Sequence, residues 1–192
     1  MIQIILENIA KSFYPVGIDP ITNYEDYIRS KEYNNLINCK KEIFSIIENS
    51  NLEIELLKMF KSNVLLADIE NVTQEPIDRC MTFRIESVEE KILYQLCVKI
   101  SVIVPYYTVY ALRNSIEFDP YRWVDLPLRD NYSEKEKFSK QILIISEIVE
   151  NRLCFNKFPE YLLNKEIENL GYSDIRLGKL TFFNAFFTED YN

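Results

Sequence analysis

Met81-Thr82-Phe83-Arg84-Ile85-Glu86 is the stretch that decides the fold class, because apolar and polar residues alternate along it. Alternation of this kind is typical of a β-strand with one face toward a core and the other toward water. It returns over residues 92–101, and Glu89-Glu90 lies between the two runs as a position for a hairpin turn. A third β-rich run over residues 106–112 follows Pro105, whose missing N–H predicts a bend, bulge or sheet edge. The middle of the chain therefore predicts an antiparallel sheet.

Helical patterns precede this sheet. Residues 2–12 place isoleucine and leucine at helical spacing, with a short strand as the alternative. Thr22-x-x-Glu25 and Ser50-x-x-Glu53 are capping-box signatures, and an apolar stripe follows each of them. They predict one long helical segment with a break near Ser30 and a second helix after it.

Helical patterns also follow the sheet. Ser133-x-x-Glu136 is a third capping-box signature and opens an amphipathic helix, while Pro159 and Gly171 bracket another. Four phenylalanines near the C-terminal end of the sequence, at spacing i, i+1, i+4 and i+5, form one broad helical face. We expect this face (Phe182, Phe183, Phe186 and Phe187) to dock onto the rest of the domain rather than to anchor a partner.

The order of the elements is helices, then strands, then helices, without a βα rhythm or a repeat. This order predicts an α+β fold in which N-terminal and C-terminal helices pack an antiparallel sheet of about three to four strands. The 192 residues fit a single domain, and no linker composition divides the range 1–192.

The composition excludes several classes of function. The chain has no histidine, which removes imidazole catalysis and histidine switches. Its three glycines, Gly17, Gly171 and Gly178, are too far apart for the common phosphate-binding loops, and we expect no cofactor. Lys plus Arg is 22 and Asp plus Glu is 30, so the net charge of −8 disfavours nucleic acid and favours a basic partner.

Further features of the sequence predict a soluble, cytoplasmic protein that does not bind membranes. The N-terminus lacks a basic leader, and the uncharged run from Ile100 to Leu112 is shorter than the roughly 20 residues of a membrane-spanning helix. The cysteines lack C-x-x-C spacing, so we expect reduced, buried thiols and no zinc site; the alternatives are a Cys80–Cys97 cross-strand disulfide or a reactive thiol. The four cysteines are Cys39, Cys80, Cys97 and Cys154.

The range 114–132 reads as a long connection, with a short fourth strand as an option, and it mixes aromatic, acidic and basic residues. Long connections are often functional, and Trp, Tyr and Arg are the preferred anchors of protein interfaces. A place for Trp123 in the core is the equally weighted alternative. The candidate partner-binding residues are Asp119, Tyr121, Arg122, Trp123 and Asp125.

Pro76-x-Asp78 and Glu89-x-Lys91 resemble the PD-(D/E)xK arrangement of metal-dependent nucleases. In that arrangement an Asp and a Glu hold a divalent ion and a Lys assists the attacking water. The resemblance would make Asp78 and Glu89 metal ligands. A solvated hairpin turn explains the same charges more simply, so we expect no metal site.

Tyr14-Pro15-x-Gly17-Ile18, Val104-Pro105-Tyr106-Tyr107 and the closing run Thr181-Phe182-Phe183-Asn184-Ala185-Phe186-Phe187 carry a second resemblance. In these segments the chain resembles small acidic immunity proteins of bacterial polymorphic-toxin loci. The resemblance implies a stoichiometric binder that blocks a cognate toxin.

The expectation from the whole sequence is a non-catalytic protein-binding module, with an immunity protein for a basic toxin as the specific case. Two alternatives stay open. One is a carboxylate- or metal-dependent enzyme that uses Asp78, Glu89 and Lys91. The other is a structural subunit of an oligomer.

Overall fold

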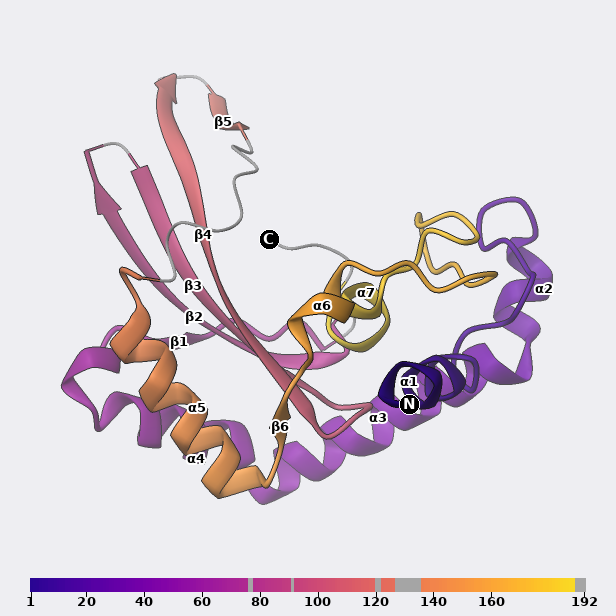
Figure 1. Cartoon of the computed structure of the whole chain (residues 1–192), viewed down its shortest axis with the longest axis horizontal. Helices are drawn as coiled ribbons and strands as arrows, with labels where there is room; N and C mark the ends of the chain where they lie inside the picture. Colours follow the sequence, from indigo (N-terminus) through magenta and orange to yellow (C-terminus); the bar gives the residue numbers. More distant parts are fainter. Residues whose placement is uncertain (76–77, 91, 120–121, 127–135, 189–192) are drawn as a thin grey trace.

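The computed structural model describes residues 1–75, 78–90, 92–119, 122–126 and 136–188 (Figure 1). Its helices are α1 (Ile2–Ala10), α2 (Tyr24–Arg29), α3 (Lys31–Ser50), α4 (Leu52–Lys61), the 3-10 turn η1 (Val64–Leu66), α5 (Ser139–Leu153), α6 (Glu160–Leu163) and α7 (Phe182–Phe186). Its strands are β1 (Glu70–Asn71), β2 (Cys80–Glu89), β3 (Ile92–Ser101), β4 (Tyr106–Asp119), β5 (Arg122–Leu126) and β6 (Asn156–Lys157). None of these helices is both long and apolar enough to cross a membrane.

The sheet confirms the α+β class but is larger than expected. Five strands pair in the order β1-β2-β3-β4-β5 with antiparallel neighbours, and β6 pairs with β4 in parallel. The expectation of three to four purely antiparallel strands is therefore wrong in number and in direction. The two missed strands, β1 and β6, have two residues each, which is too short for any periodic pattern.

One face of the sheet packs against α4, α5 and the second half of α3, which lie together on its left side in Figure 1. Alternate residues of β2 and β3 point into this core, as their alternation predicted. The rings of Phe60 in α4 and Phe83 in β2 meet edge to face at 5.2 Å between centroids. Phe44 and Ile47 bring the second half of α3 into the same cluster.

A second core lies on the right in Figure 1, between α1, the first half of α3 and the C-terminal segment. All four phenylalanines of the closing run are fully buried in it, so the expected docking of that run is confirmed. Two buried tyrosine hydroxyls tie the halves of the chain together: Tyr14 donates to the Ala185 carbonyl at 2.6 Å, and Tyr27 to the Gly171 carbonyl at 2.7 Å. The long helix α3 therefore joins the two cores, with Leu36 in the second.

The face of the sheet that was expected to be wet is largely buried near the C-terminal segment. Thr82, Lys99 and Ser101 are buried there, whereas Glu86 at the far end of β2 is exposed. The closing run lies against this face, because the Phe183 ring meets the Tyr110 ring, which lies opposite Cys97 on this face, at 5.7 Å between centroids. The alternation identified the two faces correctly, but it did not reveal that the second face would also be covered.

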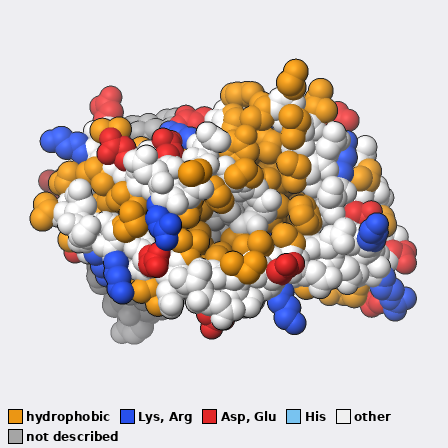
Figure 2. Space-filling model, turned by 90° about the horizontal axis from the view of Figure 1, so that it is seen from below, with side chains coloured by type: hydrophobic (Ala, Val, Ile, Leu, Met, Phe, Trp, Pro, Cys, Tyr) orange, Lys and Arg blue, Asp and Glu red, His pale blue; other side chains and the backbone are white. Residues whose placement is uncertain are grey.

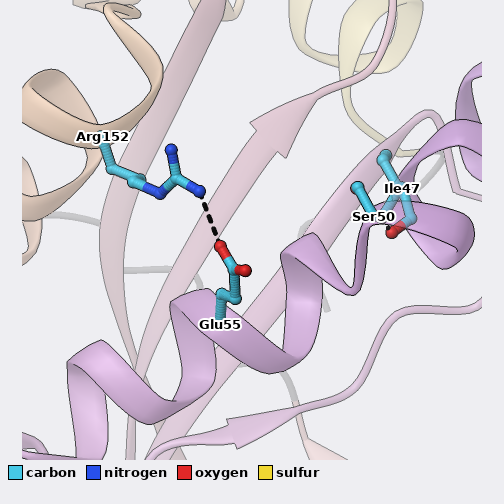
Figure 3. Close-up of polar contacts among 4 residues, drawn as sticks. All are labelled: Ile47, Ser50, Glu55 and Arg152. Atoms are coloured by element: carbon cyan, nitrogen blue, oxygen red, sulfur yellow. Dashed lines mark hydrogen bonds and ion pairs between the residues drawn. The ribbon is translucent and has the colours of Figure 1, made fainter.

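The capping signatures predicted helices correctly but named the wrong caps. The N-cap of α2 is Asn23, and the N-cap of α4 is Asn51 in the left-handed region at φ 54°; neither makes a side-chain cap. The Ser50 hydroxyl instead donates to the Ile47 carbonyl at 3.0 Å (Figure 3). Ser133 lies outside the described residues, and Phe138 precedes α5 without a side-chain cap. The helix expected after Pro159 ends at Leu163.

Ser30 is the N-cap of α3, at the position where the sequence predicted only a break in a long helical segment. Its hydroxyl oxygen accepts the Tyr33 N–H at 3.1 Å, which satisfies one of the open donors of the first turn. Ser30→Ala is expected to lower the free energy of unfolding by about 1 kcal/mol in urea denaturation. Thr22→Ala is the matched control and should change it by less than about 0.5 kcal/mol. Equal losses in the two variants would show that Ser30 is not the stabilising cap.

Candidate functional site at the hairpin end of the sheet

The segment expected as a long connection contains a projecting hairpin. Strand β4 pairs with β3 as far as the rung between Ile92 and Ser115, the last such rung among the described residues. Beyond it, residues 116–119 pair with residues 122–125 of β5. We call these two stretches the projecting hairpin, and Figure 1 shows it at the upper left, away from both cores.

The pairing of β4 with β5 places four of the five candidate partner-binding residues in this hairpin. Asp119 pairs with Arg122, and Trp123 in β5 pairs with Phe118 in β4. Asp125 lies two residues further along β5, while Tyr121 lies outside the described residues. The fourth strand that was an option is thus present, and the candidate residues share one short ladder. Their role in binding stays a prediction.

A second hairpin, between β2 and β3, reaches the same end of the sheet (Figure 1). The carboxylates of Glu89 and Glu90 are exposed at its tip. Lys137, just before α5, places its Nζ atom 2.6 Å from Glu89 Oε1 and 3.6 Å from the centre of the Tyr94 ring. This contact fastens the start of α5 to the tip. The hairpin end of the sheet therefore combines exposed carboxylates with the aromatic and charged sequence of the projecting hairpin.

The structure does not bring the nuclease-like carboxylates together. Asp78 precedes β2 and Glu89 ends it, so about 35 Å of extended chain separates them. One ion cannot contact both, because a divalent cation binds oxygen at about 2.0–2.6 Å. Lys91 lies outside the described residues. Within the described ranges, no group of three or more cysteine, aspartate or glutamate side chains is placed to hold a metal ion.

Asp78 belongs instead to a buried polar cluster that the sequence did not reveal. The Thr82 hydroxyl is its centre, at 3.3 Å from Lys99 Nζ, 3.4 Å from Asp78 Oδ2 and 3.4 Å from Cys80 Sγ. Asp78 Oδ2 also accepts the Gln74 N–H at 3.0 Å. Lys99 is 2% exposed, so its ammonium group lies in the interior beside a hydroxyl-bridged carboxylate. Positions 80 and 82 are two residues apart in a strand, so the sequence already placed their side chains on one face of the sheet. It did not show that this face would be buried.

The cysteines are all free thiols, and the expected burial holds for only two of them. Cys80 and Cys97 are buried, whereas Cys39 is half-buried and Cys154 is exposed. Register places Cys80 opposite Ser101 and Cys97 opposite Arg84, so the alternative cross-strand disulfide is not formed. Burial raises the pKa of the Cys80 thiol to about 11 and also raises the pKa of Cys97. Both thiols are therefore protonated at neutral pH and are poor nucleophiles.

The raised pKa of Cys80 predicts a loss of stability at alkaline pH. The folded state holds this proton more tightly than the unfolded state, whose thiol has the ordinary pKa of 9.0. The contribution is complete below pH 9 and is lost as the pH rises through about 11. The free energy of unfolding should therefore fall less steeply over this interval in Cys80→Ala than in the unmodified chain. Cys154→Ala, which changes an exposed thiol, should keep the original slope; equal slopes in all three proteins would contradict the prediction.

Comparison of the chain with models of protein families, with curated proteins and with solved structures finds no match.

Proposed function

We propose that the chain is a non-catalytic protein-binding module that contacts its partner through the projecting hairpin. The observation that carries this proposal is the register of β4 and β5, which sets Asp119, Arg122, Trp123 and Asp125 on one ladder beyond the end of β3. The pairing presents these residues together on one short ladder, and ordering of the hairpin before binding reduces the entropy lost on association.

Residue type and charge support a protein partner of basic character. Trp and Arg are the residues most often found as energetic anchors of interfaces, and the hairpin carries one of each. The chain has a net charge of −8, which steers a basic partner toward it and speeds association. An immunity protein that occludes a basic toxin is the specific form of this proposal, and the resemblance of the three short segments supports it.

Co-expression with the product of the adjacent gene tests the proposal. We expect a stable complex and protection of the cells from that product. Trp123→Ala should weaken the complex by about 30-fold or more in calorimetry, as the loss of a central anchor of about 2 kcal/mol requires. Tyr161→Ala is the matched control, because it removes a 73% exposed aromatic side chain from α6 and should leave the affinity unchanged. Absence of a complex, or equal affinity of both variants, would overturn the proposal.

One observation favours the structural-oligomer alternative. The outer face of α1 carries Met1, Ile4 and Ile5, all exposed, at positions i, i+3 and i+4. Figure 2 shows hydrophobic side chains gathered over the middle of this side of the molecule, where α1 lies. A second copy of the chain packed against α1 would cover this face.

Light scattering coupled to size exclusion tests this alternative. A dimer that Ile4→Lys with Ile5→Lys converts to a monomer would support it, and a monomer of the unmodified chain at all concentrations would exclude it. The third reading, an enzyme that uses Asp78 and Glu89 together, has no support from the geometry, because the two residues flank opposite ends of β2.

A further inference from the structure

The inference concerns a groove between α4 and α5 on the first face of the sheet. At one end, Glu55 of α4 and Arg152 of α5 form an ion pair at 2.6 Å, which Figure 3 shows bridging the two helices. Away from this pair lies an open hollow of about 340 Å³. We call it the α4–α5 groove, and its lining residues are Met59, Ser62, Asn63, Ile144, Glu147 and Ile148.

The groove is apolar along its walls and negative at one position. Met59, Ile144 and Ile148 supply the apolar surface, and Met59 can adjust its shape to an occupant. Two polar groups that follow α4 make local hydrogen bonds: the Ser62 hydroxyl donates to the Met59 carbonyl at 2.7 Å, and Asn63 Oδ1 accepts the Leu65 N–H at 3.0 Å. The carboxylate of Glu147 is the charged group of the lining.

Glu147 is available to an external cation. Its side chain is exposed, and the ion pairs found within the described part of the chain do not include it. Lys58 and Lys61 stand on the neighbouring helix without forming such a pair in that part of the chain. Arg152 is neutralised by Glu55. The carboxylate would repel an anion that entered the groove. A cation with an apolar stem would instead pair its charge with the carboxylate and pack its stem on the apolar walls.

We propose that the α4–α5 groove binds an arginine side chain of a protein partner. The methylene stem of arginine packs on apolar walls, and its planar guanidinium pairs with a carboxylate in bidentate fashion. The groove thus binds one basic side chain of the partner. A basic partner also suits the net negative charge of this chain. No residue of the projecting hairpin lines the groove, so this inference stands or falls separately from the hairpin proposal.

A titration with single-residue probes tests the inference without knowledge of the partner. Nα-acetyl-arginine N-methylamide is added to the 15N-labelled full chain and amide shifts are followed; its citrulline counterpart has the same shape without the charge. We expect millimolar binding with shifts grouped at the lining residues of α4 and α5. Citrulline should bind about two- to fivefold more weakly, as the loss of one exposed ion pair implies.

Two variants with matched charge changes complete the test. Glu147→Gln should abolish the difference between arginine and citrulline, whereas Glu48→Gln, an exposed change on α3, should preserve it. Equal binding of the two probes to the unmodified chain, shifts away from the groove, or no shifts at all would each overturn the inference. None of these outcomes depends on whether the hairpin binds a partner, because the probe is a single residue.

Discussion

Phe158→Ala is expected to lower the free energy of unfolding by about 3–5 kcal/mol, the range for deletion of a fully buried aromatic ring. Phe158 is 1% exposed and lies at the centre of the second core. Its ring meets those of Tyr106 at 5.5 Å and Phe187 at 5.7 Å edge to face, and those of Phe182 and Phe186 in tilted contacts. Phe158→Ala therefore removes a packing contact from Phe182, Phe186 and Phe187 at the same time.

Urea denaturation followed by tyrosine fluorescence and by circular dichroism measures this loss. Tyr161→Ala is the matched control, because Tyr161 is an aromatic residue of the same region with an exposed side chain, and it should cost less than about 0.5 kcal/mol. A loss below about 1.5 kcal/mol for Phe158→Ala would contradict the packing described for the second core, because such a value fits a half-exposed ring.

Lys99→Met is expected to destabilise the fold by about 2–4 kcal/mol, although methionine keeps much of the buried stem. The change removes the ammonium group and leaves the Asp78 carboxylate in the interior without its opposite charge. We expect a smaller loss in the free energy of unfolding than for a directly paired buried ion, because the Thr82 hydroxyl lies between the two charges. Lys179→Met, which breaks an exposed ion pair with Glu166, should cost less than about 1 kcal/mol.

A double-mutant cycle separates the ion cluster from simple packing. Asp78→Asn removes the negative charge at nearly constant shape, so the second substitution in Asp78→Asn with Lys99→Met should cost less than Lys99→Met alone. Coupling of about 0.5–3 kcal/mol is the range for residues that share a polar network. Strict additivity of the two substitutions would show that Thr82 does not connect these charges.

The sheet was predictable because its strands are long and their residues alternate. Residues of β2 and β3 such as Phe83 and Val98 lie opposite each other in the first core, as their positions in the two alternating runs implied. The closing phenylalanines were predictable for a similar reason, since their helical spacing makes one face. Strands β1 and β6 were not predictable, because two residues carry no period and their pairing depends on where neighbouring elements place them.

The candidate site was predictable in residue type but not in conformation. The mixture of Trp123, Arg122 and Asp119 marked the segment, which was expected to be a long connection. The hairpin arises because residues 116–119 continue β4 past its neighbour and find β5 as a partner. The Thr82 cluster was missed for a different reason: polarity predicted a wet face, and only tertiary packing decides whether a polar face is covered.

The bonds that join the two ends of the chain have a consequence for synthesis in the cell. The Tyr14 hydroxyl is bonded to a carbonyl 171 residues later, and α1 shares its core with α7. During synthesis, α1 and the first half of α3 emerge long before the segment around α7 that completes their core. The sheet with α4 and α5 can begin to assemble during elongation, but the apolar face of α1 stays incompletely covered until residues 182–187 have been synthesised. Chaperones that shield apolar segments are therefore expected to engage α1 during synthesis.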